Sequence, residues 1–137
     1  MDINQVKIIN FNEHGDTRGT LVAIEENKDI PFDIKRVFYM YDIDKNIVRG
    51  NHANRNSEFV LICLSGSCKI NVKDGNNSKE YILNKPSIGL YIPKMIWKEM
   101  YDFSENAVLL ALSSHFFNEN EYIDDFEQYK KEVNDND

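Results

Sequence analysis

A continuous apolar run over residues 59–64 is followed by the turn Ser65-Gly66-Ser67 and then by a strictly alternating segment. In that segment Cys68, Ile70 and Val72 are apolar, and the residues between them are polar. Alternation with period two is typical of a strand that is buried on one face only. The preceding run has no polar face, so we predict that it forms a central strand. This pair of segments favours an antiparallel β-sheet.

Short β-rich runs recur along most of the chain, with turn residues between them. Asp74-Gly75-Asn76-Asn77 is the strongest turn, because Gly and Asn accept the positive φ angles that tight hairpins need. The regular spacing is typical of a sandwich or a barrel. We predict strands over residues 6–11, 19–25, 35–43, 48–54, 58–64, 68–72, 80–83, 88–92, 96–101 and 107–113.

The periodicity changes after Asn118. Tyr122, Ile123, Phe126 and Tyr129 fall at helical spacing, with charged residues between them. We therefore predict a C-terminal amphipathic helix that packs on the barrel and frays over residues 134–137.

Length and composition restrict the class of protein. A chain of 137 residues is expected to form one domain, residues 1–137. Its net charge of −7 argues against a general nucleic-acid surface, which requires a basic face. No apolar run is long enough to cross a bilayer, and the N-terminus lacks the pattern of an export signal. We expect a cytoplasmic protein in which Cys63 and Cys68 are reduced core thiols.

A row of polar residues lies on the predicted strand before the apolar run. Side chains on a strand alternate between faces, so His52 and Asn54 should point the same way. Glu58 joins them if the strand continues without a bulge. Arg49 adds a permanent cation suited to clamping a phosphate. Such a row is either a self-satisfied buried network or the wall of a ligand cavity.

His52 has two interpretations. It is either a structural histidine held by hydrogen bonds or a general base, because imidazole ordinarily titrates near pH 6.5. A metal-binding site is the alternative, since Gly50-x-His52-x-Asn54 with Glu58 is similar to the first metal-binding motif of cupins. Asn54 stands where that motif has its second histidine. One imidazole and one carboxylate form a poor ligand set, so we expect no metal and no cofactor.

Other polar and aromatic residues are candidates for the same cavity. Arg18, in Asp16-Thr17-Arg18-Gly19, either belongs to a plain turn or supplies a second cation. The flanking residues of Tyr91 are apolar, so its ring should face the cavity, where a planar base could stack on it. Tyr39 and Trp97 are either core residues or cavity residues. Lys98 is either a solvated strand residue or part of the cavity rim.

Together these segments resemble the sugar-nucleotide 3,4-ketoisomerases, which are cupin enzymes acting on dTDP-4-keto-6-deoxyglucose. The similarity extends from about Ile8 to Tyr129. It rests on Arg18-Gly19-x-Leu21-Val22-Ala23-Ile24-Glu25-Glu26, Ile34-Lys35-Arg36-Val37-Phe38-Tyr39, Arg49-Gly50-x-His52-Ala53, Gly66-Ser67-Cys68, Gly89-Leu90-Tyr91-Ile92-Pro93, Trp97-x-Glu99-Met100 and Glu121-Tyr122-Ile123. The Arg-Gly-x-His element is also similar to that of dTDP-sugar 3,5-epimerases.

The resemblance implies an all-β, cupin-type jelly-roll barrel with a short C-terminal helix. It implies an isomerase in which His52 moves a proton from C3 to C4 of a 4-keto sugar, with Tyr39 and Asn54 as donors to the enediolate. Lys98 and Arg18 are further candidate donors. Family members commonly carry His-Ala-His, and this chain has Asn54 at the second histidine. One base is chemically adequate, because the two carbons are adjacent. Substrate binding is expected from Arg18, Glu26, Arg36, Arg49, Tyr91, Trp97 and Lys98.

The family also suggests a homodimer with an exchanged N-terminal strand, and a place in 3-amino-3,6-dideoxyhexose synthesis for bacterial surface glycans such as the lipopolysaccharide O-antigen. Two alternatives stay open. One is a 3,5-epimerase, which usually needs a tyrosine acid opposite the base. The other is a non-catalytic cupin that binds sugar nucleotides and lost its activity with the second histidine.

Overall fold

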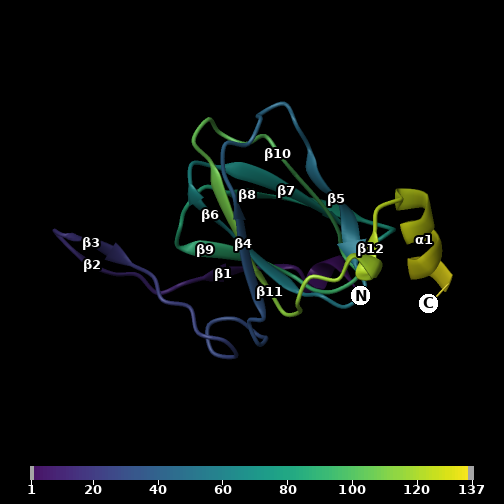
Figure 1. Ribbon diagram of the computed structural model, residues 1–137, viewed down its shortest axis with the longest axis horizontal. Coiled ribbons are helices and arrows are strands. Elements are labelled where there is room, and N and C mark those ends of the chain that lie inside the picture. Colours follow the sequence, from purple (N-terminus) through teal and green to yellow (C-terminus); the bar gives the residue numbers. More distant parts are fainter. Residues whose placement is uncertain (1, 136–137) are drawn as a thin grey trace.

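Two five-stranded antiparallel sheets face each other in the computed structural model, which describes residues 2–135 (Figure 1). The first, here the β6 sheet, has the order β1 (Lys7–Asn10), β9 (Ile88–Ile92), β6 (Phe59–Ser65), β11 (Val108–Ser113) and β4 (Arg36–Met40). The second, the β5 sheet, has the order β12 (Tyr122–Ile123), β5 (Arg49–Asn54), β10 (Trp97–Tyr101), β7 (Cys68–Lys73) and β8 (Ser78–Leu83).

The apolar run on β6 is buried because both of its faces are covered. Leu61 and Cys63 pack in the core between the two sheets. Val60 and Ile62 point to the other side and pack with Phe32 in a second cluster on the outer face of the β6 sheet. The prediction of a central strand is therefore confirmed.

β7 and its turn also follow the sequence pattern. Cys68, Ile70 and Val72 are buried, and the residues between them are partly exposed. Asp74 closes the hairpin to β8, because its Oδ1 accepts hydrogen bonds from the backbone amides of Asn76 and Asn77 at 3.0 and 2.8 Å. Cys63 is a free, buried thiol, as is Cys68, so both are core thiols as expected.

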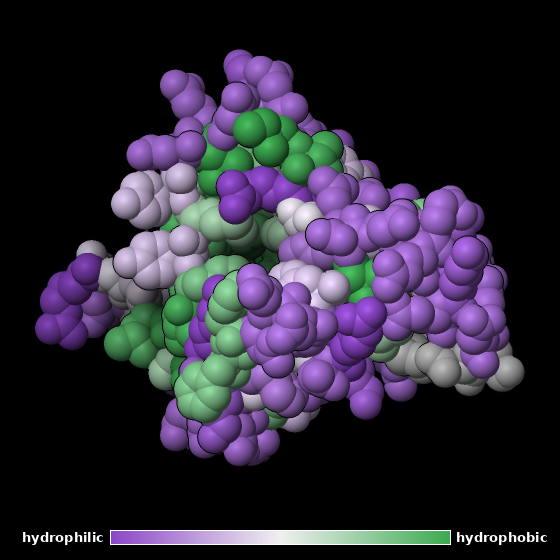
Figure 2. Space-filling view, turned by 45° about the vertical axis from the view of Figure 1, so that its right-hand side comes forward, coloured by the Kyte–Doolittle hydropathy of each residue, from purple (hydrophilic) through white to green (hydrophobic). Residues whose placement is uncertain are grey.

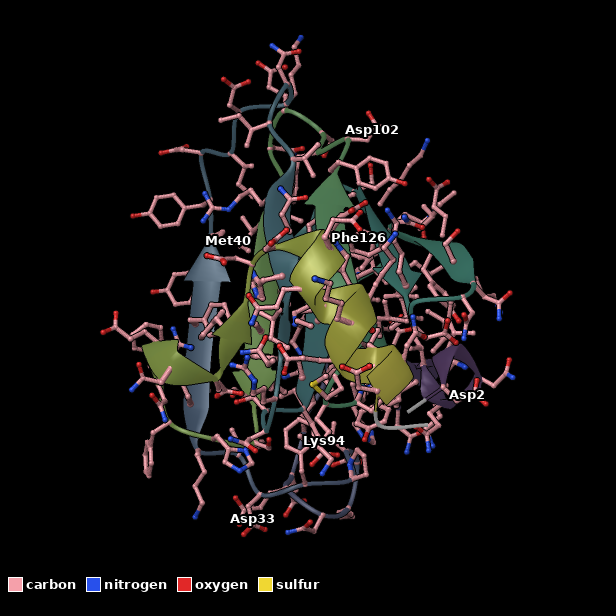
Figure 3. The ribbon with its side chains drawn as sticks, turned by 90° about the vertical axis from the view of Figure 1, so that its right-hand side faces the viewer. Asp2, Asp33, Met40, Lys94, Asp102 and Phe126 are labelled. Carbon is pink, nitrogen blue, oxygen red and sulfur yellow. The ribbon has the colours of Figure 1, made fainter. Side chains whose placement is uncertain are left out.

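The C-terminal segment differs from its prediction. The helical spacing began at Tyr122, but residues 122 and 123 form β12, after a 3-10 turn, η2 (Glu119–Glu121). β12 pairs with Asn54 and Ala53 of β5, and this tertiary pairing overrides the local periodicity. The helix α1 (Phe126–Asp135) starts later and crosses the outer face of the β5 sheet (Figure 3). The predicted fraying is not seen through Asp135, and residues 136–137 lie outside the described range.

The N-terminal region contains a projecting hairpin. After η1 (Ile3–Gln5) and β1, the strands β2 (His14–Asp16) and β3 (Gly19–Leu21) pair only with each other. They extend away from the barrel at the left of Figure 1, and all their residues are exposed. The predicted strand over residues 19–25 ends at Leu21, and the chain then crosses the outer face of the β6 sheet. Within residues 2–135, no helix is long and apolar enough to span a membrane.

Candidate active site

A small cavity of about 120 Å³ lies inside the barrel, between the two sheets. Figure 2 shows a hollow near the middle of the molecule with hydrophobic residues at its rim. The apolar part of the cavity wall comes from both sheets: Phe38, Met40, Phe59, Leu61 and Met100. Its polar part consists of Arg36, Arg49, His52, Lys98 and Tyr122. An apolar cavity with a few convergent polar groups is the usual form of a small-molecule site.

A β-bulge on β5 orients His52. The register with β10 shifts between Lys98, which pairs with His52, and Glu99, which pairs with Gly50. Gly50 and Asn51 both have positive φ, at 84° and 57°, which these two residue types tolerate better than most. A Cβ atom at Gly50 would lie 2.9 Å from the carbonyl oxygen of Lys98, so only glycine fits. The Gly50-Asn51 pair therefore makes the bend that precedes the catalytic candidate.

The hydrogen bond of His52 fixes which of its nitrogens is available. Its Nδ1 lies 3.0 Å from the carbonyl oxygen of Gly50, which can only accept a hydrogen bond, so Nδ1 carries the proton. Nε2 is then left with its lone pair. Burial lowers the pKa of His52 to about 4, and the nearby charge of Lys98 adds to this effect. His52 is consequently neutral at pH 7 and in the form that accepts a proton.

Lys98 is the second titratable group in the cavity wall. Its side chain is 3% exposed, and burial lowers its pKa to about 7. Nζ donates to Oδ1 of Asn54 at 2.8 Å and lies 4.6 Å from the ring centroid of Phe59. The sequence left Lys98 open as a solvated strand residue or a rim residue, and the structure buries it beside His52.

Glu121 lies behind Asn54 and was not recognised as a site residue from the sequence. It accepts hydrogen bonds from the backbone amide and the hydroxyl of Ser57, at 2.8 and 2.6 Å. Burial alone would raise the pKa of Glu121, but these hydrogen bonds and a third from the backbone amide of Asn56 outweigh it and lower the pKa. Only the Glu121-Tyr122-Ile123 segment of the resemblance pointed to this region, and it gave no role to the carboxylate.

The two arginines of the cavity wall come from different sheets. Arg36 on β4 lies with its guanidinium 4.2 Å from the ring centroid of Phe38. Arg49 begins β5 and also lines a neighbouring surface depression with Tyr39 and Tyr41. Two permanent cations from separate elements therefore stand at one cavity, an arrangement suited to a diphosphate.

Three predicted aromatic residues lie outside this cavity. Tyr39 is 61% exposed and stacks on Tyr41, because Phe38 and Met40 occupy the inward positions of β4. Trp97 packs under α1 on the outer face of the β5 sheet. Tyr91 lies on the outer face of the β6 sheet, so the expectation that its ring faces the cavity of His52 is wrong for this chain.

Glu58, Arg18 and Glu26 also lie elsewhere. β5 ends at Asn54, so Glu58 does not continue the polar row and instead accepts a hydrogen bond from the hydroxyl of Tyr91 at 2.5 Å. This pair lines an outer pocket of about 870 Å³. Arg18 is exposed at the tip of the hairpin and pairs with Asp16 at 2.6 Å. Glu26 accepts a hydrogen bond from the backbone amide of Ile34, at 3.1 Å, and so holds the connecting loop.

Metal ligands do not converge in the described part of the chain. Residues 2–135 contain no group of three or more His, Cys, Asp or Glu side chains arranged to hold a metal ion. The charged groups in the cavity wall are instead three basic side chains and His52. These groups can move protons and bind anions.

A barrel of two antiparallel sheets with this interior site defines a cupin-type protein. Among more distant solved structures, the fold is shared with dTDP-4-dehydrorhamnose 3,5-epimerase from Bacillus anthracis, with 14% identity, a TM-score of 0.77 and coverage of 89% of this chain and 79% of that one. The fold class predicted from the sequence is confirmed.

Three proteins of higher identity are 3,4-oxo- or 3,4-ketoisomerases. A curated TDP-4-oxo-6-deoxy-α-D-glucose 3,4-oxoisomerase from Aneurinibacillus thermoaerophilus is 46% identical over 127 residues, covering 93% of this chain and 91% of the relative. A 3,4-ketoisomerase structure from Helicobacter canadensis is 50% identical, with a TM-score of 0.92 and coverage of 94% and 97%. A His-to-Asn variant of QdtA from Thermoanaerobacterium thermosaccharolyticum, in complex with TDP-4-keto-6-deoxyglucose, is 45% identical, with a TM-score of 0.92 and coverage of 95% and 94%.

The family model described as "FdtA: WxcM-like, C-terminal" matches residues 4–134. This chain belongs to that family of sugar-nucleotide 3,4-ketoisomerases, as the resemblance of its motifs predicted, and it is an isomerase.

Proposed function

We propose that this chain converts dTDP-4-keto-6-deoxyglucose to a dTDP-3-keto-6-deoxyhexose, with His52 as the base. One observation carries the proposal: the imidazole is neutral, has its Nδ1 proton held by Gly50, and stands in the wall of a largely apolar cavity. The 46% identical relative is named for the same type of isomerisation. A QdtA variant that is 45% identical to this chain is known in complex with TDP-4-keto-6-deoxyglucose.

The reaction needs one mobile carbon-bound proton. The C4 carbonyl acidifies the C3 hydrogen, and His52 Nε2 takes this proton to give an enediolate. The same imidazole then returns it to C4, and the hydroxyl proton of O3 passes to O4, so that the carbonyl stands at C3. A hydrogen-bond donor to the enediolate oxygen stabilises it by roughly 3 to 4 kcal/mol. Asn54 was the sequence candidate for this donor, and its amide hydrogen-bonds to the buried amine of Lys98.

The nucleotide part of the substrate requires cations. We assign Arg36 and Arg49 to the diphosphate, because both line the cavity and neither is ion-paired with a carboxylate among the described residues. Arg18 can act in this way only if the hairpin moves or a second copy supplies it. The exposed hairpin and the exposed apolar residues Leu21, Val37 and Tyr39 support a homodimer with exchanged N-terminal strands. Sedimentation as a monomer at micromolar concentration contradicts this assembly.

The product is a 3-keto sugar, which is the substrate form required for amination at C3. We therefore propose that the reaction belongs to 3-amino-3,6-dideoxyhexose synthesis for lipopolysaccharide O-antigens or related surface glycans. Nucleotide sugars are made in the cytoplasm in this scheme, and the enzyme works there without a cofactor.

Incubation with dTDP-4-keto-6-deoxyglucose in D₂O, followed by proton NMR, tests the proposal. The expected result is loss of the C3 proton signal together with the appearance of a 3-keto product. A His115→Asn variant is the matched control, because this histidine lies outside the cavity and its loss should leave turnover within about twofold. Solvent exchange at C5 identifies a 3,5-epimerase instead. Binding without exchange at any carbon identifies a non-catalytic cupin.

A further inference from the structure

Lys98 and His52 are direct cross-strand partners. Their Cα atoms are paired across β10 and β5, and both side chains line the cavity. Opposed residues of neighbouring strands have Cβ atoms about 5 Å apart, so the amine and the imidazole approach a bound ligand from one side. The substrate presents a matching pair of features on that side: a carbon-bound proton and the oxygen of the adjacent carbon.

The hydrogen bonding of Lys98 leaves most of its donor capacity unused. An ammonium group has three donors, and Asn54 Oδ1 is the acceptor for one of them. Within residues 2–135 no carboxylate forms an ion pair with Nζ. Asn54 itself is 1% exposed, and its Nδ2 has no hydrogen-bond partner in the described residues. A buried amine held at one point, with its other donors free, is arranged for a ligand rather than for stability.

We propose that Lys98 carries the hydroxyl proton of the substrate from O3 to O4 while His52 carries the carbon-bound proton from C3 to C4. This inference rests on the proposed function and deepens it. Asn54 cannot titrate, so it acts as a positioning residue: its carbonyl oxygen fixes Nζ.

The proton balance closes with these two side chains. As His52 takes the C3 proton, the C3–C4 double bond forms and the C4 carbonyl oxygen takes a proton from the Lys98 ammonium. The enediol then has a hydroxyl on each carbon. The Lys98 amine next takes the proton of the C3 hydroxyl, the C3 carbonyl forms, and His52 returns its proton to C4. Both side chains finish in their starting forms, and no outside oxidant or acid is needed.

The surroundings of Lys98 favour exchange of its proton at neutral pH. The charged or titratable groups that face it are Arg36 of β4, Arg49 and His52 of β5, Tyr122 of β12 and Glu121 of η2. Burial disfavours the ammonium form and lowers the pKa of Lys98, and the negative charge of Glu121 acts in the opposite sense. A group that holds either protonation state near pH 7 is well suited to passing a proton in both directions.

Replacement of Lys98 by arginine separates this role from simple charge stabilisation. Arginine keeps the cation and donates hydrogen bonds, but it does not give up its proton at neutral pH. In Lys98→Arg we expect His52 to continue exchanging the C3 proton with D₂O while the 3-keto product forms about 100-fold more slowly. In Lys98→Met we expect both rates to fall, because the enediolate also loses its donor. Affinity for dTDP, measured by calorimetry, should stay within about threefold in Lys98→Met, since the diphosphate is assigned to the arginines.

Lys69→Met is the matched control, because Lys69 lies on the solvent-exposed face of β7 and pairs with Asp102. Its turnover should equal that of the unmodified chain. The relay is overturned if Lys98→Arg isomerises at the normal rate, or if its C3 exchange and its product formation fall together by the same factor. Failure of the unmodified chain to isomerise at all would instead overturn the proposed function. A Lys98→Ala variant rescued by added ethylamine provides an independent confirmation, and no recovery of product formation at any ethylamine concentration counts against the relay.

Discussion

The two faces of β10 carry polar side chains in opposite states. On the outer face, Glu99 accepts hydrogen bonds from Trp97 Nε1 at 3.0 Å and from Lys73 Nζ at 3.2 Å. On the inner face, one residue away, Lys98 has a single neutral partner. The outer network is complete, and α1 packs beside it. On the inner face, Lys98 and Asn54 keep hydrogen-bond donors without a partner among the described residues, at the cavity that the proposed function assigns to the substrate.

The pKa shifts also differ between the outer face of β10 and the interior of the barrel. Burial raises the pKa of Glu99, but its three hydrogen-bond donors outweigh this effect and keep it ionised. Inside the barrel, burial lowers the pKa of both His52 and Lys98, and no carboxylate among the described residues pairs with either of them. The contrast teaches that one strand can use polar side chains for stability on one side and, in the reaction proposed above, for proton transfer on the other.

The largest effect is expected on the inner face, from His52→Asn. Asparagine keeps a polar side chain but cannot accept a proton, so isomerisation should fall by about 100- to 10,000-fold. NMR assays of product formation measure this loss, and calorimetry should find dTDP affinity largely kept. Near-normal turnover in this variant refutes the assignment of His52 as the base.

Lys98→Met should stabilise the protein at pH 7, by about 1 to 4 kcal/mol, because it removes a buried amine without a carboxylate partner. The pKa of Lys98 is lowered from 10.5 in the unfolded chain to about 7 in the folded one, so the unfolded state binds more protons between these values. The advantage of Lys98→Met should therefore shrink as the pH rises toward 10.5. Urea unfolding at pH 7 and pH 10 checks this, and a variant that is less stable at both pH values contradicts it.

A lysine-to-methionine replacement on the outer face should change the stability in the opposite direction. Lys73→Met removes the ion pair with Glu99 and is expected to lower stability by about 1 kcal/mol, since the pair is partly exposed. Isomerisation should be unchanged. If Lys73→Met and Lys98→Met shift the urea midpoint in the same direction, the distinction between the two faces fails.

Tyr91→Phe is expected to have the smallest effect on activity. Tyr91 lies in the outer pocket, where its hydroxyl bonds to Glu58, so turnover and KM should stay within about twofold. Stability should fall by about 1 kcal/mol through the lost hydrogen bond. A tenfold rise in KM would instead return Tyr91 to the substrate site, as the sequence pattern suggested.

Sequence patterns predicted which residues alternate, but not which face of a strand points inward. Trp97 and Lys98 were both expected in substrate binding, but they lie on opposite faces of β10, and both faces are covered, one by the barrel and the other by α1. The same ambiguity misassigned Tyr91, because β9 is also covered on its outer side. A large aromatic residue fits either a covered outer face or the barrel interior. The pairing of His52 with Lys98 lies next to a β-bulge, which the alternation of polar and apolar residues does not reveal.

The other differences from the predictions arise from contacts between segments that are distant in the sequence. Residues 122–123 have helical spacing but pair with β5, and the exposed hairpin near Arg18 has the turn chemistry of an ordinary loop. Glu121 was missed because its partners, Ser57 and Asn56, lie more than 60 residues away in the sequence.

The bulge at Gly50 has a consequence for evolution and engineering. The group that sets the tautomer of His52 is a main-chain carbonyl, and no side-chain substitution can delete it. The residues around the sugar can therefore drift toward new substrates while the imidazole keeps its working orientation, provided that position 50 stays glycine.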